Sequence, residues 1–206
     1  MKKSLLLIGF LTFFFFILFS YLVHKDLFTQ FDFNTTVRLQ DNIPRRFDEP
    51  FSILSEIGKF EPMIILLIII LVLRRKLWGI VAFGFFGLLH IFELYGKMFV
   101  EHLPPPQFML RAKHLVDFPQ FHIRSEFSYP SGHSARAAFL TVILGIIVMR
   151  SKKFSKMQKV IILSILILYD ILMFVSRAYL GEHWISDVIG GGFLGISLGI
   201  LSMIVL

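Results

Sequence analysis

The residues best suited to chemistry lie in the stretch SRAYLGEHWISD, which joins two strongly hydrophobic segments. His183 and Asp187 are four residues apart, so on a helix they share one face. The carboxylate can then accept the imidazole N–H and leave the second ring nitrogen free to attack or to bind a ligand. Arg177 precedes them, and its guanidinium can bind phosphate through two donors. A loop with a few interfacial charges is the alternative for this stretch alone.

A second cluster is the stretch YPSGHS, residues 129–134. Pro130 ends an extended segment, and Ser131 with Gly132 predicts a helix start, where free backbone amides bind anions. His133 falls in the first turn of that helix and is available as a proton donor. Because the same pattern also serves as an ordinary helix cap, this stretch by itself leaves both interpretations open.

The third feature is a polar stripe on an apolar helix that we expect to end at Leu103. Its members are three or four residues apart and therefore lie on one face. Ionisable groups within a membrane span are costly, so by default they face a cavity or one another. A simple Glu93–Lys97 ion pair is the alternative. The stripe consists of His90, Glu93, Lys97 and Glu101.

Together the three clusters supply a lysine, an arginine, a helix N-terminus, two histidines and a carboxylate. This set predicts a phosphoryl-transfer site that needs no metal. The cations and amides stabilise the charge on the phosphate, one histidine attacks, and the other protonates the leaving oxygen.

These motifs resemble those of the type 2 phosphatidic acid phosphatase family, which shares its site with the vanadium haloperoxidases. One family motif is present whole as Pro-Ser-Gly-His at residues 130–133. Another is present as Ser176-Arg177, five residues, His183, three residues and Asp187. The resemblance covers residues 97–187 and the arrangement of the membrane spans.

The resemblance implies a role for each matched residue. His183 would be the nucleophile that forms a phosphohistidine, Asp187 would orient it, and His133 would be the general acid. The phosphate-binding residues that the resemblance implies are Lys97, Ser131, Gly132 and Arg177.

The sequence departs from the family at one position. The family motif has a lysine, six residues, an arginine and a proline, whereas here Lys97 is followed at those positions by Pro104 and Pro105. On a continuous helix Pro104 would extend the polar stripe, so the chain lacks one expected phosphate-binding cation.

Arg136 is our first candidate for the replacement. It lies one helical turn after His133, at the start of an apolar span where an unpaired charge is costly. It could instead pair with Glu182 or reach the lipid headgroups. Arg111 and Arg124, in the predicted outer segment, are further alternatives.

The composition indicates a membrane protein. Of 206 residues, 56% are hydrophobic, above the roughly 45–50% typical of soluble domains, and the mean hydropathy is +0.75. We predict an all-α polytopic membrane protein: one domain over residues 1–206, with six transmembrane helices in one bundle and an outward-facing active site. The predicted spans are Ser4–Val23, Phe60–Leu73 (with an earlier start near Ile53), Leu77–Leu94, Ala135–Met149, Val160–Val175 and Val188–Leu206.

Three further patterns concern how the spans are placed. The first span resembles a signal peptide, but its length and the lack of a small-residue cleavage site favour a retained span. Scattered apolar residues in 24–59 predict an amphipathic helix on the bilayer surface. Gly191, Gly195 and Gly199 recur every four residues, which favours close helix packing.

The positive charge follows the topology. Basic residues without acidic neighbours flank the spans on one side, whereas the other side carries both signs. The positive-inside rule therefore places both termini in the cytoplasm and the site at the outer face of the plasma membrane. The net charge of +7 is then not a sign of nucleic-acid binding. The predicted inner-side residues are Lys2, Lys3, Arg74, Arg75, Lys76, Arg150, Lys152, Lys153, Lys156 and Lys159.

These observations predict an integral membrane phosphatase that hydrolyses a lipid phosphate or pyrophosphate through a phosphohistidine, without a metal or other cofactor. The absence of cysteine excludes a disulfide, a thiolate metal site and a thiol nucleophile. The expected partners are the lipid substrate and the bilayer. Undecaprenyl pyrophosphate, phosphatidylglycerophosphate and phosphatidate all remain open as substrates, and so does the oligomeric state. A lipid phosphotransferase would use the same residues, and an impaired binding or scaffold protein is the non-enzymatic alternative.

Overall fold

The computed structural model describes residues 2–74, 78–112 and 126–205, and within these ranges every regular element is helical. The predicted all-α class is therefore confirmed for the described residues. In chain order the elements are α1 (Lys2–His24), α2 (Thr29–Asn42), η1 (Arg45–Phe47), α3 (Asp48–Ile57), α4 (Phe60–Arg74), α5 (Trp78–Phe99), η2 (Gln107–Met109), α6 (Gly132–Arg150), α7 (Lys156–Tyr179), α8 (Ile185–Ser202) and η3 (Met203–Val205).

Five helices in the described ranges are long and apolar enough to cross a membrane: α1, α5, α6, α7 and α8. The remaining predicted span corresponds to α4, which is apolar over Phe60–Ile70 but shorter. The expectation that this span begins near Ile53 is wrong. α3 ends at Ile57 with Gly58 as its C-cap, and Pro62 lacks the N–H that a helix continuing from α3 would require.

α8 lies at the centre of the bundle and packs against α6, α1 and α5. Glycines allow α8 and α6 to approach each other closely. A Cβ on Gly191 would lie 2.3 Å from the carbonyl oxygen of Ser131, and one on Gly195 would lie 2.1 Å from that of Ala135. A larger side chain would push α8 away from the start of α6. The predicted packing role of these glycines is therefore confirmed.

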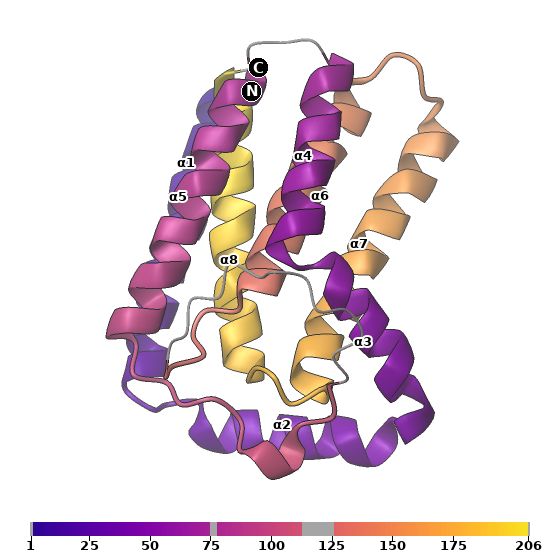
Figure 1. Cartoon of the computed structure of the whole chain (residues 1–206). Helices are drawn as coiled ribbons and strands as arrows, with labels where there is room; N and C mark the ends of the chain where they lie inside the picture. The colour runs from indigo at the N-terminus through magenta and orange to yellow at the C-terminus, as the bar shows by residue number, and fades with distance from the viewer. Residues whose placement is uncertain (1, 75–77, 113–125, 206) are drawn as a thin grey trace.

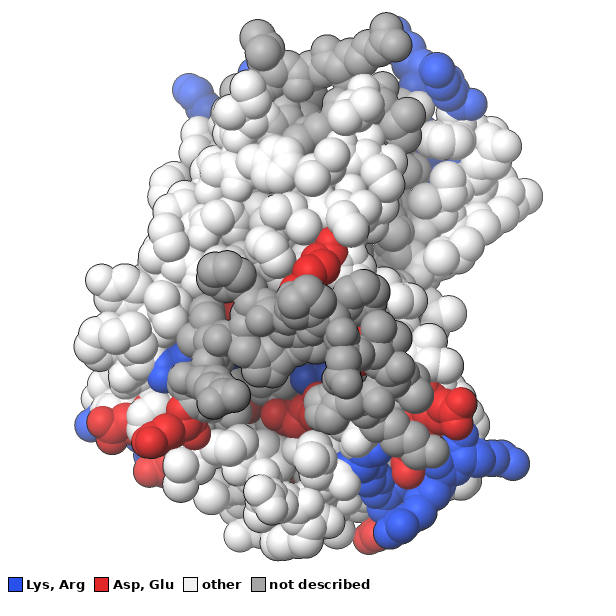
Figure 2. Space-filling model, in the orientation of Figure 1, with Lys and Arg blue, Asp and Glu red and all other residues white. Residues whose placement is uncertain are grey.

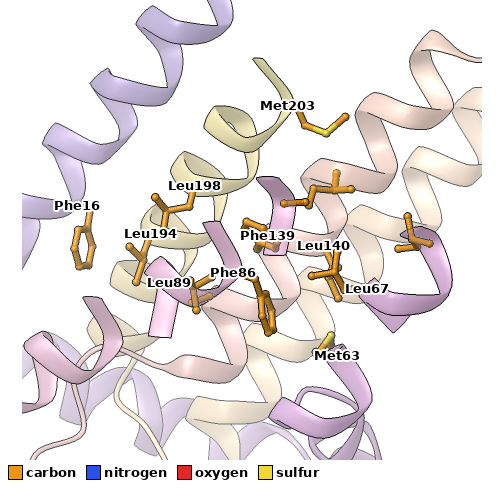
Figure 3. Close-up of a cluster of buried hydrophobic side chains, with 14 of the residues drawn as sticks. Phe16, Met63, Leu67, Phe86, Leu89, Phe139, Leu140, Leu194, Leu198 and Met203 are labelled. Carbon is orange, nitrogen blue, oxygen red and sulfur yellow. The ribbon is translucent and has the colours of Figure 1, made fainter. Parts of the chain in front are cut away.

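A hydrophobic core fills the space between the helices (Figure 3). Buried side chains from five helices meet there, among them Phe16, Leu67, Phe86, Phe139 and Leu194. On the outer surfaces of α1 and α7, in contrast, large apolar side chains are exposed, which suits contact with lipid because the hydrocarbon core of a bilayer offers no polar partner. Examples are Phe10, Phe14, Ile161, Ile165 and Leu168.

The two ends of the bundle differ in charge. Both termini lie at one end with the turn between α6 and α7, while α2 crosses the opposite end (Figure 1). Lys and Arg gather at the end that holds the termini, whereas both signs occur at the α2 end (Figure 2). The band between them is mostly uncharged. This arrangement agrees with the prediction that the basic segments flank the spans on one and the same side.

α2 has one face toward the bundle and one away from it. Phe31 is exposed, whereas Asp32 is buried. Near the helix end, the amide of Gln40 donates to the carbonyl of Tyr179 at 2.8 Å, which fastens α2 to the end of α7. The segment 24–59 forms two α-helices, α2 and α3, with η1 between them, and α2 is built into the base of the bundle (Figure 1). Its contact with the bilayer surface stays a prediction.

α5 ends at Phe99, so the predicted end at Leu103 is wrong. The chain turns away where the amide of His102 donates to the carbonyl of Val100 at 2.6 Å. Pro104 is exposed and lies beyond the helix. The expected extension of the polar stripe along a continuous helix to Pro104 is therefore also wrong.

Candidate active site

A cavity of 610 Å³ opens beside the start of α6 and the last turns of α5. Residues from α3, α4, α5, α6, the end of α7 and the segment that joins α7 to α8 line it. Ser131 and Asp187 are fully buried and lie outside this lining. The cavity nevertheless unites the three sequence clusters. The predicted site residues that line it are Lys97, Gly132, His133, Arg136, Arg177 and His183.

His183 lies in the turn between α7 and α8, just before α8 begins at Ile185. Its Nδ1 is 3.4 Å from Asp187 Oδ2, and the same oxygen accepts the Trp184 amide at 3.0 Å. The predicted contact between His183 and Asp187 is present, although His183 precedes the helix and does not share its face. Because Nδ1 is directed at the carboxylate, Nε2 is the nitrogen left to react.

His133 occupies the first turn of α6 and lines the cavity. Its Nε2 is buried and has no hydrogen-bond partner among the described residues. Because such an atom is costly to leave unpaired, its position beside the cavity is suited to a bound polar group. The nitrogen is therefore placed where it could exchange a proton with a substrate.

Ser131 is the N-cap of α6. Its Oγ accepts hydrogen bonds from the amide and the hydroxyl of Ser134, at 3.5 and 3.1 Å. Its amide donates to the carbonyl of Asp187 at 3.0 Å. Ser131 thus ties the start of α6 to the start of α8, and its side chain faces the helix end rather than the cavity.

Lys97 and Arg136 converge on Glu93. Lys97 Nζ is 3.3 Å from Glu93 Oε1, and Arg136 Nη1 is 3.0 Å from Glu93 Oε2. Arg136 Nε also donates to the carbonyl of Gly58 at 3.1 Å. The carboxylate lies against Gly132, where a Cβ would be 2.1 Å from Oε1. An anionic group thus already lies between two cations and a helix N-terminus, a place that stabilises negative charge.

Arg177 is buried at the end of α7. Its Nη1 contacts the hydroxyl of Ser55 and the carboxylate of Glu182. Glu182 therefore pairs with Arg177, whereas Arg136 pairs with Glu93. The alternative interpretation in which Arg136 pairs with Glu182 is wrong.

Other candidates lie farther from the site. Arg111 is outside the cavity lining, and its guanidinium lies 5.2 Å from the ring centroid of Tyr179. Arg124 lies outside the described residues. On α5, His90 lines the cavity with Glu93 and Lys97, but Glu101 is beyond the helix end and exposed.

Two residues that the sequence motifs did not include lie behind His183. His102 Nδ1 is 2.8 Å from Asp187 Oδ1, and His102 Nε2 is 3.6 Å from Asp32 Oδ2. In the sequence, the short distance between His102 and Lys97 was only a weak indication that His102 belongs to the site. Nothing in the sequence around Asp32 distinguishes it from the other charges of the 24–59 segment.

The surroundings of these two histidines shift their pKa values in opposite directions. Burial lowers the pKa of His183, and the positive charges of Arg177 and Lys97 lower it further, against the opposing effect of Asp187. Burial also acts to lower the pKa of His102, but its hydrogen bond to Asp187 and the negative charges nearby raise the pKa overall. These shifts favour a neutral His183 beside a protonated His102.

A comparison with protein families matches residues 75–206 to the PAP2 superfamily. The chain belongs to this family. The family model covers more than half of the chain and includes every motif that the sequence analysis singled out, so the predicted resemblance is confirmed. Together with the apolar helices, family membership makes the chain a multi-pass membrane protein.

One curated protein is similar to this chain over part of its length. Phosphatidylglycerophosphatase B of Bacillus subtilis is 29% identical over 138 residues, which are 66% of this chain and 63% of that protein. The match therefore spans less than two thirds of the relative.

Two solved structures share the fold. One is described as the first transmembrane PAP2 type phosphatidylglycerolphosphate phosphatase from Bacillus subtilis, with a TM-score of 0.75, 24% identity, and coverage of 94% of this chain and 93% of that one. The other is LpxE of Aquifex aeolicus, with a TM-score of 0.64, 24% identity, and coverage of 84% and 94%.

Proposed function

We propose that this chain is a lipid phosphatase that releases phosphate from a lipid phosphate or pyrophosphate through a phosphohistidine. One observation carries the proposal: His183 and His133 line the same cavity as the cations Lys97, Arg136 and Arg177. The family relationship supports it, since a curated relative is a phosphatidylglycerophosphatase. Enzymes catalyse phosphoryl transfer mainly by positioning the reacting groups and by stabilising charge, and this arrangement of side chains is suited to both.

The reaction proceeds in two steps. His183 Nε2 attacks phosphorus, the bond to the lipid oxygen breaks, and His133 donates a proton to that oxygen. A water molecule then attacks the phosphohistidine, gives a proton to His133, and releases phosphate as the phosphorus–nitrogen bond breaks. Lys97, Arg136, Arg177 and the first amides of α6 stabilise the charge on the phosphoryl oxygens, so we propose that no metal takes part.

The walls of the cavity favour a lipid as the substrate. Beyond the charged groups, the lining continues as apolar side chains from α4 and α5, two helices that run along the bundle. Such a wall can hold the first methylene groups of a lipid tail while the phosphate lies at the start of α6. The apolar lining residues of α4 and α5 are Phe60, Ile64, Phe83, Phe86, Ile91 and Leu94, with Gly87 among them.

A release assay tests the function directly. Detergent-solubilised protein is incubated with undecaprenyl pyrophosphate, phosphatidylglycerophosphate or phosphatidate, with and without chelator, and free phosphate is measured. We expect release from at least one lipid, unaffected by chelator and absent in His183→Ala. Transfer of the phosphoryl group to an added alcohol in place of water would favour a phosphotransferase. No release from any of these lipids would contradict the proposal.

We further propose six spans, counting α4, in the plasma membrane, with both termini in the cytoplasm and the cavity open toward the outer face. The uneven distribution of basic residues supports this orientation. Since the chain has no cysteine, single cysteines can report it. An impermeant maleimide added to intact cells should label Asp41→Cys but not Lys153→Cys, both at exposed positions. The reverse pattern would overturn the orientation.

A further inference from the structure

A histidine lies between two buried carboxylates on the side of His183 that faces away from the cavity. His102 donates from Nδ1 to Asp187 Oδ1 at 2.8 Å, and its Nε2 is 3.6 Å from Asp32 Oδ2. Asp32 in turn accepts the amide and the hydroxyl of Ser186, at 2.9 and 2.6 Å. The exposed fractions are 0% for Asp187, 1% for Asp32 and 7% for His102. Three elements that are distant in sequence thus meet in one buried network.

The backbone holds His102 in place. The amide and the hydroxyl of Ser128 donate to its carbonyl at 2.9 and 3.1 Å. The indole of Trp184, the residue after His183, donates to the carbonyl of Leu103 at 2.7 Å. The loop after α5 is therefore fastened directly to the turn that carries His183.

The chemistry at His183 places two demands on Asp187. When Nε2 bonds to phosphorus the imidazole becomes positively charged, so the carboxylate must be ionised and must face Nδ1. Burial works against the first demand, because a buried carboxyl group favours its neutral form. A single contact does not meet the second demand, because a carboxylate held at one oxygen can rotate. A donor on the second oxygen counters the cost of burial and fixes the carboxylate plane.

We propose that His102, held by Asp32, is a positioning residue that keeps Asp187 ionised and oriented behind His183. The inference rests on the proposed role of His183 as the nucleophile. His102 acts through Asp187, since it does not line the cavity. Two carboxylates against one histidine leave one negative charge, which can offset the positive charge that develops on His183.

The electrostatics agree with this role. Burial opposes protonation of His102, but the hydrogen bond to Asp187 and the charges of Asp187, Asp32 and Asp26 hold the pKa of His102 above its ordinary value. The positions of Asp187 and Asp32 therefore favour the protonated form of His102. If His102 had only a structural role, neither Asp187 nor Asp32 would need to be ionised.

Kinetics of three variants test the proposal. His102→Ala removes the donor and the charge, His102→Asn keeps an amide donor near the position of Nδ1, and Asp32→Asn removes only the outer charge. We expect kcat to fall about 10–100-fold in His102→Ala, the range seen when partners that orient functional histidines are removed. KM should change little, and His102→Asn should recover part of kcat. His24→Ala, at an exposed position, is the matched control. Wild-type kcat in folded His102→Ala would overturn the proposal.

A double-mutant cycle separates positioning from general damage to the structure. In an Asp187→Asn background, His102→Ala should cost little more, because the residue through which it acts has already been changed. An equal fold-loss in both backgrounds would show a structural role and overturn the inference.

A titration that does not need activity provides the second test. In protein labelled with 15N-histidine, the His183 signals are assigned by their loss in His183→Ala and followed against pH. The His102→Asn change removes a positive charge beside Asp187, so we expect the pKa of His183 to rise. An unchanged value would overturn the inference even if phosphate is released. Failure of the proposed function would instead appear in the wild-type release assay, and this titration would still decide the role of His102.

Discussion

The two sides of His183 differ in charge and in access. On the cavity side, Lys97, Arg136 and Arg177 are set against the carboxylates of Glu93 and Glu182. On the other side, the carboxylates of Asp187 and Asp32 flank His102 in a network closed off from the cavity. The cations of the first side line the cavity and are accessible to a ligand, whereas Asp187, Asp32 and His102 are buried and do not line it.

In the proposed mechanism, this difference would let one small site serve an anionic substrate and a nucleophile that becomes cationic. Cations that face the cavity attract phosphate and stabilise the charge that spreads over its oxygens. Carboxylates behind the imidazole stabilise the positive charge that forms there. The carboxylates of Glu93 and Glu182 on the cavity side are each paired with a cation, which reduces their repulsion of a phosphate. We therefore propose that the different surroundings of the two faces of His183 serve the two charges that develop in the reaction.

The largest expected effect comes from removing the reacting histidines, His183 and His133. His183→Ala should lower kcat on the order of 10⁴-fold or more, as loss of a covalent nucleophile does elsewhere, and should form no phosphoenzyme. His133→Ala should still form phosphohistidine from a substrate with a good leaving group, because that group needs no proton. Rapid quenching with a ³²P-labelled substrate measures both. Labelled phosphohistidine in His183→Ala would mean that another residue attacks.

A smaller effect is expected on the cavity side. Arg136→Ala should lower kcat/KM about 10²–10³-fold, the loss typical of one donor that stabilises transition-state charge. In this variant the ion pair between Arg136 and Glu93 is lost, whereas the pair between Lys97 and Glu93 is kept. The measurement is kcat/KM for the preferred lipid, with circular dichroism to confirm folding.

The double variant Arg136→Ala/Glu93→Gln decides between two roles for Arg136. If Arg136 serves only to neutralise Glu93, removing the carboxylate charge should restore most of the activity. If it binds phosphate in place of the arginine missing at Pro104, the double variant should stay slow. We expect the second result. Near-normal activity in Arg136→Ala alone would contradict both roles.

The apolar wall provides a test with an expected effect of several-fold. Gly87 lines the cavity and a Cβ there would meet no atom within 4 Å, so Gly87→Leu would fill space that we assign to a lipid tail. Gly84 is the matched control, since it is equally open and on the same helix but does not line the cavity. Gly87→Leu should slow turnover of long-chain lipids more than of a soluble short-chain phosphate. Equal effects on both substrates, or in Gly84→Leu, would argue against a tail at this wall.

The sequence predicted the cavity side much better than the side behind His183. Lys97, His133, Arg177 and His183 stand in motifs whose residue types and spacing already express their chemistry. Five of the six predicted spans correspond to long apolar helices, because an apolar run of fixed length is a property of local sequence; the sixth, at α4, stays a prediction. These features need no knowledge of which distant segments meet.

The network behind His183 could not be predicted in the same way. Asp32 lies in an amphipathic segment, and only the path of α2 across the base of the bundle brings it to the start of α8. His102 reaches Asp187 because α5 ends at Phe99, before the predicted end at Leu103. Both depend on tertiary contacts that propensity and spacing do not contain.

The smallest expected effect is a change in how stability depends on pH. Because the pKa of His102 is raised in the fold, its protonated form stabilises the protein fully below the ordinary value of 6.5, and this contribution is lost as pH rises through the folded value. The difference in Tm between wild type and His102→Asn should therefore be greatest on the acidic side and shrink as pH rises above 6.5. His183, with its lowered pKa, has the opposite sign and loses stability as pH falls below 6.5, so His183→Ala should reduce that loss. Thermal unfolding in detergent from mildly acidic to mildly alkaline pH measures both trends. A difference for His102→Asn that does not vary with pH would mean that the fold does not raise the pKa of His102, and a difference that grows as pH rises would mean that the fold favours neutral His102; either result would remove the proposed cation between Asp187 and Asp32.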